Sequence, residues 1–352
     1  MVTFFDLIQD NTFRTYVERR LATGTKNPEY SFPTVFPALY KYRPMSKYVV
    51  DDILAGRIMA TSIGKFNDLF DGVMHNYGTK EKRIQAAENE WNELEKLRIS
   101  AGISDSLLKH EDYVEMYAEH FKTESRLNFR ELDYLGTYIC CLSSKCDSTL
   151  MWAHYANSNT GVCIEYDFND TKLKPMVFPM AYSQKPVDLS DLLTDEKGKV
   201  YQYPLDAAVL CAALNKAMVW NYENEWRLVF VLATAKDHEC RLPLIAPFIP
   251  KSITFGYHFL KPFFYYDYKN KIEQDSARDN LCNMLQLLAY TKEQKIPVAI
   301  MTPVIGEYAL SKKPIEASEL MQLIEYYFTD NRPKDMRYYY VVHDELMDLL
   351  EK

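Results

Sequence analysis

The sequence predicts an α+β protein, with a mixed or antiparallel sheet body, a helical insertion and a helical C-terminal region. Three observations support this fold class. Segments with strand character and segments with helical spacing both occur, but they do not alternate regularly as a doubly wound sheet requires. A polar helical stretch at about 80–130 separates two groups of strand-like segments. From Gln274 onward, apolar and charged residues recur mainly at helical spacing.

The elements follow in order along the chain. Residues 1–35 are predicted as a helix and a proline-punctuated arm, residues 36–262 as the core domain with its insertion, and residues 263–352 as a helical region packed on the core. Strands are predicted at 38–43, 58–63, 137–143, 161–168, 175–182, 226–232, 253–257 and 296–301. Helices are predicted between 46 and Gly56 and at 205–220, 277–290, 317–328 and 341–352.

Composition excludes several classes of protein. A formal charge of −8 and a pI near 5.5 argue against nonspecific nucleic-acid binding. The seven cysteines form no CxxC pair, which favours a reducing cytoplasm over a disulfide framework. No basic leader and no long apolar run is present, so no membrane association is expected. The thinly spread glycines, 11 in all, form neither GxGxxG nor GxxxxGK[ST].

Four short stretches carry more polar and aromatic character than packing requires. They are LYKYR (39–43), FNDLFDG (66–72), LSSKCDSTLMWAHY (142–155) and WNYENEWR (220–227). They supply the catalytic candidates Glu223, Glu225 and His154, and the ligand-binding candidates Lys41, Tyr42, Arg43, Asn67, Asp68, Ser143, Trp152, Tyr155 and Arg227.

The charged candidates admit two interpretations. Glu223 and Glu225 fall on one side of an extended backbone, where they could accept hydrogen bonds from ribose hydroxyls or share a proton. Lys41 and Arg43 share a strand face and suit a phosphate or a carboxylate, which Arg binds in a bidentate manner. The alternative for both pairs is internal ion pairing, for example of a glutamate with Arg227 or Arg43. As a hypothesis, the acids face a cleft together with Lys41, Arg43 and His154.

The third stretch combines groups that suit nucleotide binding. His154 could act as acid or base near neutral pH, Trp152 could stack on a flat ring and Ser143 could bond a phosphate or a ribose. The alternative is a buried packing cluster of Trp152 and Tyr155 with a hydrogen-bonded histidine.

The second stretch favours loop geometry, and Asp68 is a candidate helix cap. Asp68, Asp71 and His75 have spacings that would place metal ligands on one helical face, but Gly72 and the Asn-Asp turn argue against a continuous helix. No metal is therefore expected.

These four stretches, in this order, resemble a bacterial domain-of-unknown-function family, twenty-nine seventy-one, which is related to abortive-infection proteins of the AbiG type. The resemblance covers about 38–260, and Trp152, His154, Tyr155 and Trp226 recur in register. The sequence departs from the family at Leu69, where a proline is usual, and in its long helical insertion. The resemblance implies a role in bacterial phage defence or in a toxin-antitoxin system, but it implies no activity.

The order of motifs is also similar, more distantly, to ADP-ribosyltransferases, which use a basic residue on the first strand, a serine on a middle strand and a late glutamate around NAD. This similarity implies NAD as the substrate, with Arg43 holding the dinucleotide, Ser143 orienting the ribose, Trp152 or Tyr42 stacking on a ring and Glu225 polarising the ribose hydroxyl. LSSK stands where the transferases have S-T-S.

Two other functions stay open. The first is a metal-dependent hydrolase of nucleic acid or nucleotides that uses Asp68, Asp71 and His75. The second is a non-catalytic sensor that holds a nucleotide-type ligand and contacts a protein partner through its C-terminal helices. The 27 tyrosines agree with a protein interface.

Overall fold

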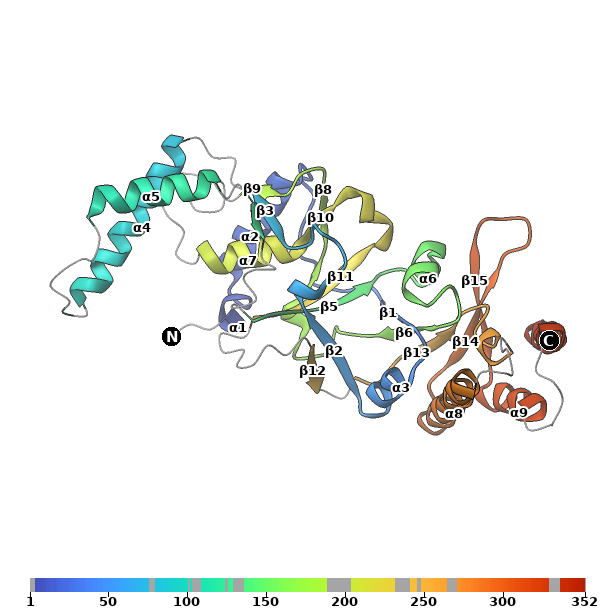
Figure 1. Cartoon of the computed structure of the whole chain (residues 1–352). Coiled ribbons are helices and arrows are strands. Elements are labelled where there is room, and N and C mark those ends of the chain that lie inside the picture. Colours follow the sequence, from blue (N-terminus) through green and yellow to red (C-terminus); the bar gives the residue numbers. More distant parts are fainter. Residues whose placement is uncertain are drawn as a thin grey trace.

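A ten-stranded, mostly antiparallel sheet forms the centre of the protein (Figure 1). The computed structural model describes residues 4–75, 80–100, 102, 109–123, 126–128, 136–188, 204–231, 241–245, 248–264, 271–328 and 336–351. The main path of the sheet is β12-β2-β5-β1-β6-β13-β14-β15; β11 also pairs with β5, and β7 pairs with β11. Within this sheet only β13 and β14 are parallel among the described strands. The predicted α+β class is confirmed.

The strands are short, and most lie where the sequence predicts them. In the central sheet they are β1 Leu39–Arg43, β2 Arg57–Ser62, β5 Thr137–Ser143, β6 Val162–Tyr166, β7 Val177–Pro179, β11 Glu225–Val231, β12 Arg241–Ile245, β13 Ser252–Phe255, β14 Val298–Pro303 and β15 Leu310–Ile315. Two small sheets contain β8 Ala181–Ser183 with β10 Asn215–Ala217, and β3 Val73–His75 with β4 Arg126–Asn128 and β9 Val187–Asp188.

Helices cover the sheet on both faces. The α-helices are α1 Phe4–Leu7, α2 Asn11–Gly24, α3 Lys47–Leu54, α4 Lys80–Ser100, α5 His110–Thr123, α6 Thr149–Tyr155, α7 Pro204–Leu214, α8 Lys271–Gln294, α9 Ala317–Phe328 and α10 Met336–Leu350. Helix α3 packs against β2 and α8, whereas α6 contacts β1 and α7 contacts β11. None of the helices in the described part of the chain has the length and apolar character needed to cross a bilayer.

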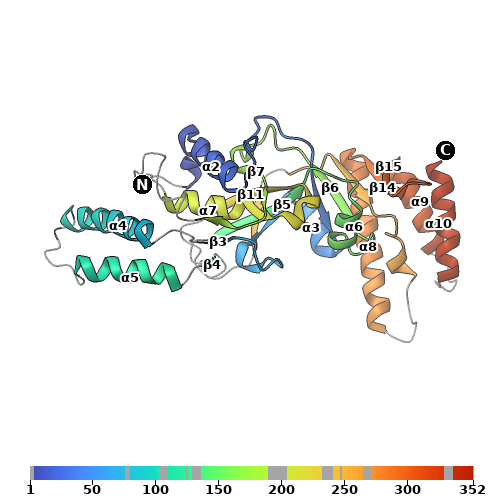
Figure 2. The same ribbon diagram turned by 90° about the horizontal axis from the view of Figure 1, so that it is seen from above.

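The predicted insertion contains a helical hairpin. Helices α4 and α5 pack against each other and extend away from the sheet (Figures 1 and 2). The short strand β4 follows at Arg126–Asn128 and pairs with β3, so the chain returns to the body before 130. Residues 129 and 130, at the end of the predicted insertion, lie outside the described residues.

One predicted helix ends early. The helix predicted at 205–220 stops at Leu214, and Asn215–Ala217 instead pairs in parallel with β8. The buried side chain of Asn215 accepts a hydrogen bond of 2.8 Å from the Ser183 hydroxyl, which favours this pairing over another helical turn. Met218–Glu223 then forms a 3₁₀ helix that leads directly into β11.

The sheet also continues into the region predicted as helical after 263. Strand β14 was predicted, but β15 was not, because LSKKPI has no alternating apolar pattern. Lysines and a proline are typical of an edge strand, and β15 lies at one end of the strand order. The predicted boundary at 262 therefore does not coincide with an edge of the sheet.

The strand register decides which side chains share a face. Tyr40 on β1 lies opposite Ser143 on β5, and Ser143 lies opposite Glu225 on β11. Side chains directly opposite each other project from the same face, and neighbours along a strand alternate. Lys41 and Arg43 therefore project from the face opposite to that of Ser143 and Glu225.

Candidate functional site

A ladder of buried charges links β11 to the loop after β2. The charge ladder consists of Asp71, Arg227, Glu225, Lys216 and Glu223, in that order of contact, and each of these side chains is at most 7% exposed. Positive and negative groups alternate along it, so each cation contacts two carboxylates. Such an arrangement compensates the cost of burying charge only when the hydrogen bonds are complete.

Arg227 uses its whole guanidinium group. It donates two hydrogen bonds to the Asp71 carboxylate, at 2.7 and 2.6 Å, and its Nε donates to Glu225 at 2.8 Å. Its Nη1 also donates to the carbonyl oxygen of Ala213 at 2.7 Å, in the last turn of α7, where the helix dipole favours a cation. Arg227 thus joins three segments that are far apart in the sequence.

A left-handed residue brings the two glutamates together. Glu223 ends the 3₁₀ helix, Asn224 has φ 45° and ψ 49°, and Glu225 begins β11. Both carboxylates accept a hydrogen bond from the Lys216 ammonium group, Glu225 at 2.9 Å. The two acids were predicted to lie on one side of an extended backbone; they meet at one ammonium group, but through a turn.

The pKa values of the two glutamates are shifted in opposite directions. Burial raises the pKa of Glu223, and the neighbouring Glu225 adds to this rise, whereas Lys216 opposes it. Burial also disfavours the charged form of Glu225, but Arg227 and Lys216 outweigh burial and hold its pKa well below the usual value. Neighbouring carboxyl groups with pKa values moved in opposite directions are a known arrangement at acid-base sites.

Three polar side chains lie at the Glu223 end of the ladder and are called the rim here: Tyr155, His154 and Tyr222. The Tyr155 hydroxyl donates to Glu223 at 2.6 Å, and burial followed by this hydrogen bond raises the pKa of Tyr155. Next to it, Nδ1 of the exposed His154 lies 3.1 Å from the hydroxyl of Tyr222. Tyr155 therefore contacts the ladder directly, whereas the described contacts of His154 are with Tyr155 and Tyr222.

The Ser143 hydroxyl forms its hydrogen bonds with backbone groups. It is fully buried, its hydroxyl donates to the carbonyl oxygen of Glu223 at 2.6 Å and accepts from the amide of Lys145 at 3.1 Å. These bonds fix the end of β5 against the turn that carries the two glutamates. Both hydrogen-bonding capacities predicted for a ribose or a phosphate are thus used internally in this structure.

The aromatic candidates form a packed cluster. Trp152 is fully buried, its indole Nε1 donates to the carbonyl oxygen of Cys146 at 2.8 Å, and its ring meets Tyr42 edge to face with centroids 5.3 Å apart. The Tyr42 hydroxyl donates to the carbonyl oxygen of Lys145 at 2.8 Å. The packing alternative of the sequence analysis describes Trp152 better than stacking on a ligand.

The FNDLFDG stretch forms a turn that delivers Asp71. The amide of Phe70 donates to the Asp68 carboxylate at 3.0 Å, and Asn67 is exposed beside it. Asp71 is only 2% exposed, and both of its oxygens accept hydrogen bonds from Arg227. The side chain of His75 lies outside the described residues. Asp71 is thus occupied by an internal cation rather than placed as a metal ligand.

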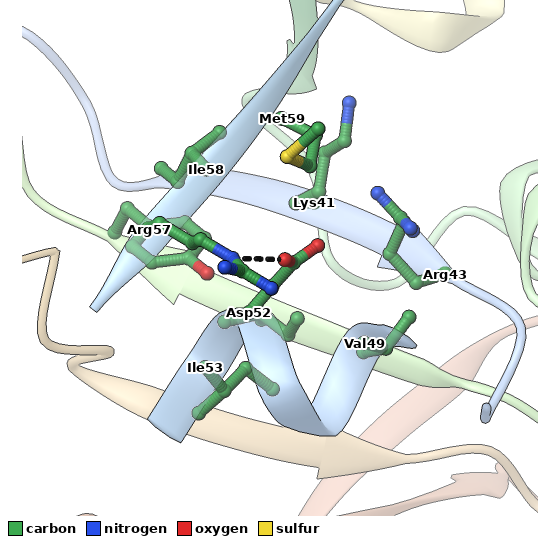
Figure 3. A pocket seen from close by; sticks show the side chains of 10 residues that line it. Lys41, Arg43, Val49, Asp52, Ile53, Arg57, Ile58 and Met59 are labelled. Atoms are coloured by element: carbon green, nitrogen blue, oxygen red, sulfur yellow. Dashed lines mark hydrogen bonds and ion pairs between the residues drawn. The ribbon is translucent and has the colours of Figure 1, made fainter. Parts of the chain in front are cut away.

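Lys41 and Arg43 line a pocket on the other face of the sheet. It lies between β1, β2, β6 and α3, and Figure 3 shows their side chains with Asp52 and Arg57 around it. Nε of Arg57 donates to Asp52 at 2.6 Å, and Asp52 is the single carboxylate among the lining residues. Lys41 donates from its ammonium group to the carbonyl oxygen of Cys141 at 2.8 Å. The lining thus contains three cationic side chains and one anionic side chain.

Arg43 differs from every charge in the ladder. Its half-buried guanidinium group has no hydrogen bond or ion pair to any residue in the described part of the chain. The backbone around it is tightly held, because a Cβ atom on Gly161 would lie 2.2 Å from the Arg43 carbonyl oxygen. A closely packed backbone therefore presents an arginine without an ion pair to a pocket.

The predicted shared cleft is not formed. The register separates Lys41 and Arg43 from Glu225, so the predicted site residues divide between the ladder with its rim and the β1–α3 pocket. The sequence analysis did not identify Lys216, Asp52 or Arg57. Asp52 and Arg57 flank the predicted helix end at Gly56, which was a usable signal for a local ion pair. Lys216 had no such signal, because it fell within a predicted helix.

The fold and the site define an α+β protein with a buried charge ladder on one sheet face and a cationic pocket on the other. Residues 151–228 match the model of a family described as Protein of unknown function (DUF2971). The match confirms the predicted resemblance to that family in the segment that contains MWAHY and WNYENEWR. No curated protein and no solved structure matches the chain significantly.

Proposed function

We propose that the protein binds a small anionic ligand in the β1–α3 pocket and acts as a ligand sensor. The unpaired Arg43 carries this proposal. Unpaired cations near a protein surface attract anions, and a guanidinium group provides two parallel donors to a phosphate or a carboxylate. Arg57 and Lys41 add further positive charge within the same lining. A nucleotide-type molecule, NAD included, belongs to this ligand class.

The geometry favours binding over NAD cleavage at Glu225. A glutamate that stabilises a developing positive charge on a ribose must reach the substrate. Glu225 is 4% exposed, and its carboxylate is held by Arg227 and Lys216. Arg43, which would hold the dinucleotide, projects from the other sheet face. The transferase hypothesis thus requires Glu225 to leave two cations, which the sensor hypothesis does not.

A sensor also fits the biological setting that the family resemblance implies. We place it in the bacterial cytoplasm, in phage defence, where a change in a nucleotide-type metabolite would be its input. Helices α9 and α10 are the proposed contact for a protein partner, because Tyr326 and Tyr340 are 66% and 59% exposed there.

Calorimetric titration of the full chain with NAD and with ADP tests the proposal. A charge-assisted hydrogen bond contributes roughly 1.5–3 kcal/mol, so Arg43→Ala should weaken binding by about 10- to 100-fold. Lys47→Ala is the matched control, because Lys47 is 72% exposed on the neighbouring helix and pairs with Asp51 outside the pocket. Its affinity should stay within about two-fold of the unmodified protein.

The same samples test the enzymatic alternative. Released nicotinamide is measured with the unmodified protein and with Glu225→Gln. Release that Glu225→Gln abolishes while the protein stays folded would favour the transferase or glycohydrolase. Equal binding by the unmodified protein and Arg43→Ala would contradict the sensor proposal at this pocket.

A further inference from the structure

The β1–α3 pocket has an excess of two positive charges. Lys41, Arg43 and Arg57 are the cations of its lining, and Asp52 is the carboxylate. Resting on the proposed function, we propose that the preferred ligand presents a terminal phosphate monoester, which carries two negative charges when fully ionised. A dianion balances this lining, whereas a phosphodiester or a carboxylate leaves one cation without a counter-charge.

The arrangement of the charges supports a single compact group. Asp52 holds Arg57 at 2.6 Å, and Figure 3 shows its carboxylate between Arg57 and Arg43. Arg57 therefore has a fixed orientation, with Nε occupied by Asp52. Lys41 is partly engaged with a backbone carbonyl, so its ammonium keeps two further donors. Arg43 is the anchor with all its donors available among the described residues.

The size of the pocket agrees with this assignment. The enclosed part of the pocket is small, about 20 Å³, and the rest is open to solvent. The pocket can therefore take the charged end of a ligand, with the remainder of the molecule outside. A diester presents substituents on both sides of its phosphorus atom, which this narrow space accommodates less well.

Asp52 has a defined electrostatic role in this proposal. It orients Arg57 and also repels an incoming anion, so it lowers the affinity for every anion. The repulsion acts twice as strongly on a dianion as on a monoanion. Asp52→Asn should thus tighten binding of a monoester more than that of a diester. If Asp52 only maintained local folding, its replacement would weaken both.

The decisive experiment compares adenosine 5′-monophosphate with its methyl ester, which has the same base and sugar and one charge fewer. Calorimetry on the full chain at pH 7.5 and constant ionic strength should give about ten-fold tighter binding of the monophosphate, and Arg43→Ala should remove the difference. Because the second pKa of a phosphate monoester is near 6, binding of the monophosphate should fall about three-fold at pH 5.5, whereas binding of the methyl ester should not. The titratable lining consists of Asp52, Lys41, Arg43, Arg57 and Tyr166, and burial raises the pKa of Tyr166, so it stays neutral.

The outcomes separate the two proposals. Equal binding of both compounds, weakened by Arg43→Ala, would overturn the monoester preference and leave anion binding intact. If neither adenosine compound binds, methyl phosphate and dimethyl phosphate are compared by NMR chemical-shift titration, because both are small enough for the pocket. Tighter binding of methyl phosphate than of dimethyl phosphate supports the monoester preference and shows that the organic part of the ligand is not adenosine. No Arg43-dependent shift with either compound overturns both proposals.

Discussion

The charge ladder and the β1–α3 pocket are built from the same kinds of side chain, yet they differ in whether the charges are satisfied. In the ladder, each cation contacts two carboxylates, and all five side chains are buried. In the pocket, cations are in excess and Arg43 has no described partner. The comparison teaches that residue type alone does not separate the two regions. The presence or absence of an internal counter-charge does.

The two regions also differ in what they do for the fold. Arg227 connects the FNDLFDG turn, the end of α7 and β11, so removing it would leave buried charges alone. Arg43 connects nothing through its side chain among the described residues. Stability measurements and binding measurements should therefore respond to different variants.

The largest effect is expected for Arg227→Met, which removes the charge but keeps much of the volume. Asp71 and Glu225 lose their shared cation in a buried site, and breaking a buried ion pair costs about 3–5 kcal/mol. Urea denaturation measures the loss. Arg57→Met is the control, because its ion pair is partly exposed, at 38% for Arg57, and should cost less than about 1 kcal/mol. Similar losses of unfolding free energy for Arg227→Met and Arg57→Met would contradict the contrast between the ladder and the pocket.

A smaller and asymmetric effect is expected for the two glutamates. Glu225→Gln removes a carboxylate that two cations require, so a loss of about 1.5–3 kcal/mol is expected. Glu223→Gln should cost less than about 1 kcal/mol, since burial already disfavours the charged form of Glu223. Thermal denaturation at pH 7 compares the two. A greater loss for Glu223→Gln would contradict the opposite directions of the two pKa shifts.

The same asymmetry predicts opposite pH dependences. The raised pKa of Glu223 means that its favourable contribution is present at low pH and is lost as the pH rises through its folded pKa. The lowered pKa of Glu225 means that its contribution is present above its unfolded pKa and is lost as the pH falls through its folded pKa.

Melting temperatures between pH 3.5 and 7 test these signs. The destabilisation by Glu225→Gln should shrink toward low pH, whereas that by Glu223→Gln should shrink toward neutral pH. Parallel curves for the two variants would show that the carboxyl groups titrate alike.

The smallest effect on stability is expected for Arg43→Ala. Its guanidinium group has no described partner, and it faces two other cations, so its loss should change the unfolding free energy by less than about 0.5 kcal/mol. Urea denaturation under the conditions used for Arg227→Met provides the measurement. If Arg43→Ala lowers the unfolding free energy by more than about 2 kcal/mol, Arg43 stabilises the fold, and the proposed ligand role is weakened.

Short-range patterns in the sequence were sufficient for most elements. The alternation in 38–43 and in 137–143 predicted β1 and β5, and the helical spacing in 317–328 predicted α9. Residues 215–217 were predicted wrongly as part of an α-helix, because their helical propensity is outweighed by pairing with β8, which is distant in the sequence. The same error concealed Lys216 as the partner of Glu223 and Glu225.

The sequence by itself determined the α+β class, most element positions and the polar motifs from which both regions are built. Only the tertiary structure decided which charges are paired, because Asp71 and Arg227 are 156 positions apart and meet only when β11 packs beside the FNDLFDG turn. The strand register likewise placed Arg43 and Glu225 on opposite faces of one sheet. Local patterns arise from backbone geometry within a few residues, whereas counter-charges are chosen by contacts between distant segments.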